Sequence, residues 1–84
     1  MRYRLLISVE VLGFLERLPG RLRLALRNLI EEIGDDPMSR SDATEYDREG
    51  RLMHIAIRGG YALVFWIDDA DRHVKVMEIH AADK

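Results

Sequence analysis

Two short apolar segments on either side of a glycine pair constrain the fold of this 84-residue chain more than any other feature. They run from Arg51 to Arg58 and from Tyr61 to Ile67, and apolar side chains recur in both at alternate positions. This period of two is typical of strands, and Gly59-Gly60 can adopt the positive φ angles of a tight turn. The stretch therefore predicts an antiparallel hairpin rather than a helix.

The amount of apolar surface on each side of these strands predicts which side points into a core. Side chains alternate between the two faces of a strand, so odd-numbered and even-numbered positions separate. The bulkier set is odd-numbered, and we expect it to form the core side: Met53, Ile55, Ile57, Tyr61, Leu63, Phe65 and Ile67. His54 and Arg58 would then lie together on the opposite, open face. Val64 and Trp66 would share that face on the next strand.

The segments outside the hairpin predict two helices and further strands. Apolar side chains three or four positions apart predict helices over 9–18 and 21–33, and alternating patterns predict strands over 2–7, 44–47 and 74–79. The order predicts one α+β domain over residues 1–84, in which an antiparallel helical hairpin covers one face of a three- to four-stranded, mainly antiparallel sheet. We expect the core to contain Leu26, Leu29, Ile55 and Leu63.

Composition narrows the classes of function. The net charge of −2 argues against a dedicated nucleic-acid binder, although residues 1–30 carry six Arg and only two Glu. Because the chain has no cysteine, it offers neither a disulfide framework nor a thiolate ligand. No apolar run reaches the ~18–20 residues of a membrane span, and the first residues lack the apolar segment of a signal peptide. We therefore expect a cytoplasmic protein without a membrane partner.

Several motifs, in their order and spacing, resemble the RelE/ParE family of toxins. Phe14 to Pro19, followed by an Arg-rich helix and an exit at Pro37, is similar to the first half of that family. Ile57 to Asp68 resembles its hairpin, in which a glycine and a tyrosine precede an apolar strand and an acidic turn. Val74 to His80 is similar to the family's last strand. Together these motifs cover nearly the whole chain.

The resemblance implies the toxin of a type II toxin–antitoxin system. Its first implication is a ribosome-dependent mRNA endoribonuclease that inhibits translation without a metal or other cofactor. Two alternatives stay open: a ParE-like toxin that binds a protein target such as DNA gyrase, and a relative that has lost catalysis and only binds an antitoxin. The partners implied are a cognate antitoxin and, for an active enzyme, the ribosome and mRNA. A homodimer is a further candidate assembly.

The resemblance also implies candidate catalytic residues. In the branch of the family that uses histidines, one histidine lies before the hairpin turn and another follows the last strand, and His54 and His80 match these places. Arg58 stands where the family often has a basic residue. His54 would take the proton of the 2′-hydroxyl, Arg58 would hold the phosphate, and His80 would protonate the leaving oxygen. The family's arginine after the hairpin tyrosine is Ala62 here, which departs from the pattern.

Two further interpretations concern ligands other than RNA. Trp66, with Val64 beside it at strand spacing, is a candidate contact for a partner protein, because large aromatic side chains are favoured at such interfaces. The three histidines show no His-x-x-x-His spacing, so the sequence predicts no metal site.

Overall fold

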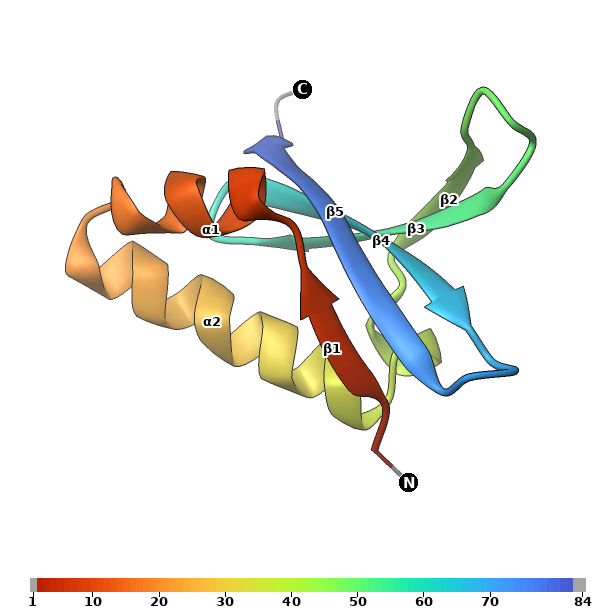
Figure 1. Ribbon diagram of the computed structural model, residues 1–84. Coiled ribbons are helices and arrows are strands. Elements are labelled where there is room, and N and C mark those ends of the chain that lie inside the picture. Colours follow the sequence, from red (N-terminus) through yellow and green to blue (C-terminus); the bar gives the residue numbers. More distant parts are fainter. Residues whose placement is uncertain (1, 83–84) are drawn as a thin grey trace.

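The structure is a computed structural model that describes residues 2–82, and in this range it contains two α-helices and five strands (Figure 1). The N-terminal half forms β1 (Arg4–Ile7), α1 (Val9–Glu16), α2 (Gly20–Asp35) and a 3₁₀ turn, η1 (Met38–Arg40). The C-terminal half forms β2 (Ala43–Tyr46), β3 (Leu52–Arg58), β4 (Tyr61–Asp68) and β5 (His73–Ala81). The predicted central hairpin, both helices and the short strand near residues 44–47 are confirmed.

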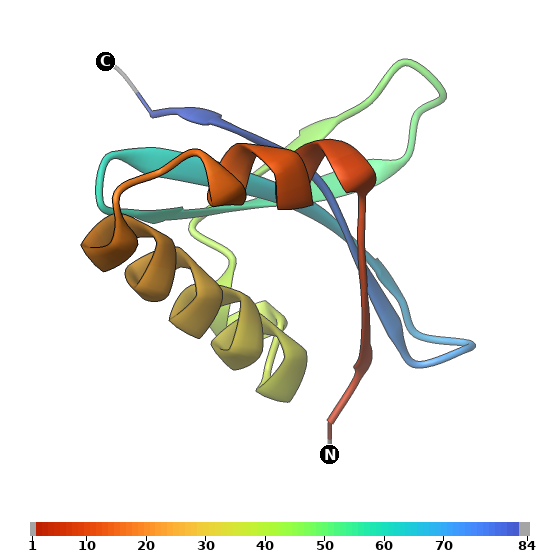
Figure 2. The same ribbon diagram turned by 60° about the vertical axis from the view of Figure 1, so that its left-hand side comes forward.

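All five strands belong to one sheet, in the order β1-β5-β4-β3-β2. The chain-order neighbours β2–β3, β3–β4 and β4–β5 pair antiparallel, and β1 adds to the edge of β5 as a parallel strand. Figure 2 shows both helices on the same side of the sheet. The α+β class and the one-sided helical layer are therefore as predicted, and the sheet has five strands because both short edge strands join it.

Local sequence signals explain the ends of the helices. The Ser8 hydroxyl accepts a hydrogen bond from the backbone N–H of Val11 and caps α1. Residues 17–19 separate α1 from α2, and Pro19 is the N-cap of α2. α2 continues two residues beyond the predicted end at Ile33. Gly34 lets this last turn of α2 pack closely against β1, because a side chain there would meet Leu5 at 3.1 Å. Neither helix in the described part of the chain combines the length and apolarity needed to span a bilayer.

The hydrophobic core lies between the helices and one face of the sheet. Leu26, Leu29 and Leu63 are at most 2% exposed, so three of the four predicted core residues are confirmed. Ile55 is the exception: it is only half-buried and does not belong to the core cluster. The cluster comprises Val11, Leu15, Leu26, Leu29, Ile30, Ile33, Ala56, Leu63, Phe65, Val74 and Val76.

The predicted orientation of β3 is wrong. Its register pairs Ala56 with Leu63 and His54 with Phe65, and paired residues share a face of the sheet, so the even-numbered side chains of β3 point toward the helices. The small Ala56 is fully buried there, whereas Ile57 on the other face is 50% exposed. The cause is the close approach of α2, which leaves room for an alanine and places the bulkier isoleucines on the far side.

Matched truncations on the two faces of the hairpin measure this orientation. We expect Leu63→Ala to reduce the free energy of unfolding by about 2–5 kcal/mol, since it removes a fully buried side chain. Ile57→Ala should cost less than ~1 kcal/mol, because Ile57 is half exposed. Urea unfolding followed by circular dichroism gives both values. A larger loss for Ile57→Ala than for Leu63→Ala would contradict the assigned faces.

Candidate functional site

The two sides of the sheet differ in what they can contact. We call the side covered by α1 and α2 the helix face and the other side the open face. Cross-strand pairing places one central set of side chains on the open face: Ile55, Ile57, Ala62, Val64, Trp66, Lys75, Glu78 and His80. A partner or substrate that approaches the sheet surface meets these side chains first.

His54 lies on the helix face rather than the open face. It is 5% exposed, and its ring stacks on Phe65 with 5.4 Å between the ring centroids. Its Nδ1 is 2.7 Å from the Oγ of Ser41, in the connection between η1 and β2. Burial lowers the pKa of His54 below its ordinary value, because the charged imidazole is less well solvated inside the protein. The predicted position of this side chain on the open face is therefore wrong.

Arg58 also points to the helix face, where it forms a two-bonded ion pair with Glu32 of α2. The two guanidinium nitrogens donate to the two carboxylate oxygens at 2.9 and 2.8 Å. The hydrogen bonds raise the pKa of Arg58 and hold the pKa of Glu32 below its ordinary value. The Nε of Arg40 is 3.1 Å from the same carboxylate. Arg58 thus joins β3 to α2 and η1, and its predicted position on the open face is wrong.

His80 occupies the open face near the end of β5. It is exposed and lies opposite Ala62 of β4. His54 and His80 are therefore on opposite faces of one sheet. The structure does not bring the three predicted catalytic residues together on one surface.

Trp66 is the centre of a cationic cluster on the open face. The guanidinium carbon of Arg51 and the Nζ of Lys75 each lie 4.7 Å from the centroid of its ring. Both distances are within the range of cation–π attraction. We call these three residues the Trp66 cluster. The sequence analysis missed Arg51 and Lys75, because Lys75 reaches Trp66 only through a shift in register at the bulge between Val64 and Phe65.

Val64 is on the open face as predicted but is not an accessible contact. It is only 3% exposed, because it lies between Ile55 of β3 and Glu78 of β5. The expectation that Val64 is accessible beside Trp66 is wrong. Among the apolar side chains of the open face, the half-exposed Ile57 offers contact area instead.

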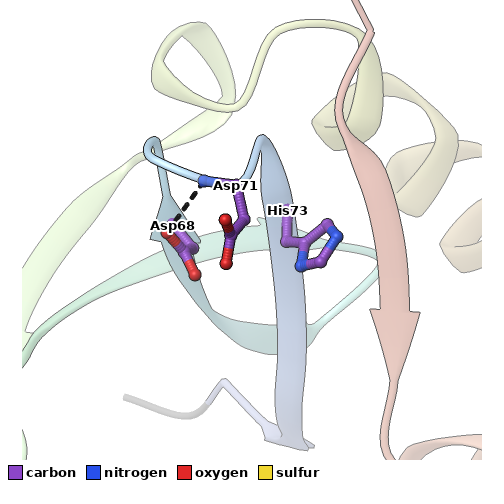
Figure 3. A group of neighbouring side chains, drawn as sticks. All are labelled: Asp68, Asp71 and His73. Carbon is purple, nitrogen blue, oxygen red and sulfur yellow. Dashed lines mark hydrogen bonds between the residues drawn. The ribbon is translucent and has the colours of Figure 1, made fainter.

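Three potential metal ligands meet at the turn between β4 and β5 (Figure 3). One ligand atom from each of Asp68, Asp71 and His73 lies within 4.8 Å of the others. Asp68 also accepts a hydrogen bond from the backbone N–H of Asp71. Carboxylate and imidazole ligands suit divalent transition metals. The Asp-x-x-Asp-x-His spacing was the signal in the sequence, and a search for paired histidines alone misses it.

The fold and the placement of these residues define a class: a small α+β protein with a helical hairpin on one face of a mixed, mainly antiparallel sheet. No family model and no curated protein matches the sequence. Solved structures do match it. A chain of the archaeal RelE–RelB complex from Pyrococcus horikoshii OT3 has a TM-score of 0.84 at 19% identity, over 100% of this chain and 99% of that chain.

Two further structures agree. A chain of the toxin–antitoxin complex RelBE2 from Mycobacterium tuberculosis has a TM-score of 0.83 at 21% identity, with 99% of this chain and 95% of that chain covered. The isolated E. coli RelE toxin gives 0.75 at 23% identity, over 98% and 86% of the two chains. This chain therefore has the fold of RelE toxins, and the predicted resemblance is confirmed at the level of the fold.

The buried imidazole makes stability depend on pH in a defined direction. Since the folded pKa of His54 is lowered from 6.5, the unfolded chain takes up the proton first as the pH falls. The stability that the neutral ring provides is full above pH 6.5 and is lost as the pH falls toward the folded pKa, by at most about 1.4 kcal/mol per pH unit.

Unfolding in urea between pH 7 and 5 measures this loss. We expect His54→Gln to flatten the dependence in that window, whereas His80→Gln, at an exposed position, should leave it unchanged. Glu32 does not interfere, because its pKa is lowered from 4.5 and its contribution changes only at more acidic pH. An unchanged slope in His54→Gln would contradict the neutral, buried state of this imidazole.

Proposed function

We propose that this chain is the toxin of a type II toxin–antitoxin system and that a protein antitoxin neutralises it. The observation that carries the proposal is the match along nearly its whole length to RelE chains that were solved in complexes with RelB antitoxins. The matches include almost the full length of the partner-bound chains as well, 95% and 99% in two of these complexes. A whole domain that corresponds in this way is available to make the same kind of complex.

The open face is the surface through which the toxin acts. On the helix face, His54 is buried and the charge of Arg58 is neutralised by Glu32, so neither is free to meet a target. The open face offers Trp66 with its two cations and the half-exposed Ile57. An aromatic side chain beside apolar and cationic groups suits the centre of a binding interface.

Cleavage of mRNA on the ribosome is the second candidate function, and the Trp66 cluster favours it. Single-stranded RNA is bound by aromatic rings that stack on bases and by cations that contact phosphates, and Trp66, Arg51 and Lys75 provide both. His80 is an exposed imidazole on the same face and is available for proton transfer. This mode uses Lys75 and His80 in place of His54 and Arg58. A ParE-like toxin would instead use the same face to bind a protein.

Induced expression in a bacterial host tests the proposal. We expect growth arrest, and we expect relief of that arrest when a small protein encoded by a neighbouring gene is expressed with the chain. Mapping of mRNA ends then separates the modes of action: new ends within translated messages indicate cleavage, and intact messages indicate binding to a protein target. Normal growth in cells that contain folded protein, with no complex formed with the product of the neighbouring gene, would contradict the proposal.

Substitutions in the Trp66 cluster test the surface through which the toxin acts. Arg51 and Lys75 provide the two positive charges of the cluster. We therefore expect the double variant Arg51→Ala/Lys75→Ala to be less toxic, so that about tenfold or more colonies survive induction than with the parent chain. Arg48→Ala is the matched control, since Arg48 is an exposed arginine in the turn between β2 and β3. Full toxicity in the double variant would exclude this cluster as the site of action.

A further inference from the structure

The strand register places an imidazole beside the carboxylates of the turn between β4 and β5. His73 is the first residue of β5 and pairs with Asp68, the last residue of β4. Paired residues share a face of the sheet, so the ladder, and not the turn, brings His73 to this position. The Nδ1 atoms of His54 and His80 each have a hydrogen-bond partner, whereas the ring of His73 has none within residues 2–82.

Two carboxylates next to this imidazole also have no counter-charge. Neither Asp68 nor Asp71 takes part in an ion pair in the described part of the chain. Asp68 accepts a hydrogen bond through one oxygen, from the backbone N–H of Asp71, and its other oxygen remains available as a ligand. Two negative charges held this close repel each other, and a cation bound between them relieves the repulsion.

The other two charged side chains of the turn are engaged by the segment around β1. The Tyr3 hydroxyl donates to Oδ1 of Asp69 at 2.6 Å, and the guanidinium carbon of Arg72 lies 4.3 Å from the centroid of the Tyr3 ring. The backbone N–H of Arg4 donates to the carbonyl oxygen of Arg72 at 2.8 Å. These contacts hold the turn in place, so the three remaining side chains are supported by an anchored backbone.

The spacing of the three ligand atoms leaves room for a metal ion. Figure 3 shows the carboxylate of Asp71 between the carboxylate of Asp68 and the imidazole of His73. One ligand atom from each residue lies within 4.8 Å of the others, so a point between them is at most about 2.8 Å from each. Small rotations of these side chains then give the ~2.0–2.2 Å bonds of zinc to nitrogen and oxygen.

The chemistry of the three ligands selects the class of metal. Oxygen ligands alone suit Mg²⁺ or Ca²⁺, whereas an imidazole favours transition ions such as Zn²⁺. Three protein ligands leave at least one position of a four-coordinate ion to water or to another molecule. Asp68 and His73 follow the paired Trp66 and Lys75 by two positions, so they lie at the end of the open face.

We propose that Asp68, Asp71 and His73 form a binding site for a divalent transition-metal ion, represented by Zn²⁺. The ion neutralises the two carboxylates and joins the last residue of β4 to the first residue of β5. It keeps an open coordination position at the end of the open face that carries the Trp66 cluster. This site goes beyond the proposed toxin function and does not depend on it.

Isothermal titration calorimetry of the purified full chain with ZnCl₂ tests the site. We expect one Zn²⁺ per chain with a dissociation constant on the order of 1–100 μM, and binding of Mg²⁺ that is at least about tenfold weaker. Asp71→Asn and His73→Ala should each weaken Zn²⁺ binding about tenfold or more, because each removes one of three ligands. Circular dichroism of both variants checks that they fold.

Two matched variants are the controls. Asp69→Asn makes the same change in the same turn and keeps an oxygen that accepts from Tyr3, and His80→Ala removes an exposed histidine elsewhere on β5. Neither should change the affinity for Zn²⁺. Absence of Zn²⁺ binding up to ~1 mM, tighter binding of Mg²⁺ than of Zn²⁺, or equal losses in Asp69→Asn and Asp71→Asn would each overturn the proposal.

Nuclear magnetic resonance locates the bound ion independently of its affinity. Paramagnetic Mn²⁺ broadens the amide signals of residues close to it, so we expect residues 68–73 to lose signal first. The turn between β2 and β3 is the internal comparison, since it carries Asp47 and Glu49 but no histidine, and Arg51 already pairs with Asp47. Broadening there at the same Mn²⁺ concentration would contradict a specific site at residues 68–73.

Discussion

The close packing of α2 against β3 decides what the rest of this sheet can present. Where the helix approaches, β3 carries the fully buried Ala56, and on either side of it His54 and Arg58 find polar partners. Arg58 meets a carboxylate of the helix and His54 meets the Ser41 hydroxyl, so the two polar side chains are buried or half-buried without unmet hydrogen bonds. The packing of this face of β3 thus engages two of the three side chains that the sequence suggested for catalysis, His54 and Arg58.

For function, the consequence is that a target would be contacted by the open face rather than by the helix face. On the open face, Trp66 lies between two cations, Lys75 of β5 and Arg51 just before β3. The half-exposed Ile57 of β3 adds apolar surface to the same face. A RelE-like scaffold built this way has fewer options for acid–base chemistry than for binding, because the exposed imidazole of His80 and the buried imidazole of His54 lie on opposite faces of the sheet. The proposed toxin activity is therefore best understood as binding first, with cleavage dependent on His80 and Lys75.

The short first strand has a second consequence. Because β1 ends at Ile7 and Ser8 caps α1 at once, the chain leaves the sheet after four residues of parallel pairing. β5 is longer than its partner, so backbone groups at its end face a groove instead of a strand. Proteins usually cover or charge such edges to prevent uncontrolled pairing.

The sequence by itself determined the elements of this protein and the order of its fold. Alternation around Gly59-Gly60 predicted the central hairpin, the helical periodicity of residues 9–33 predicted the helical pair, and the resemblance to RelE/ParE toxins predicted their arrangement. These features depend on local propensity and on patterns that a single segment contains. The sequence also named three residues of the core, Leu26, Leu29 and Leu63, because these leucines are apolar positions that face inward in any arrangement of the elements.

Only the tertiary structure decided which face of β3 is buried and which residues meet on the open face. Either side of β3 could be buried. The prediction from apolar bulk placed Ile55 and Ile57 in the core, whereas the space beneath α2 accommodates the smaller Ala56. The Trp66 cluster depends on a bulge that shifts the register of β5 by one residue, and the sequence of one strand contains no information about the register of its neighbour. Sites assembled across strands are therefore decided by packing rather than by any one segment.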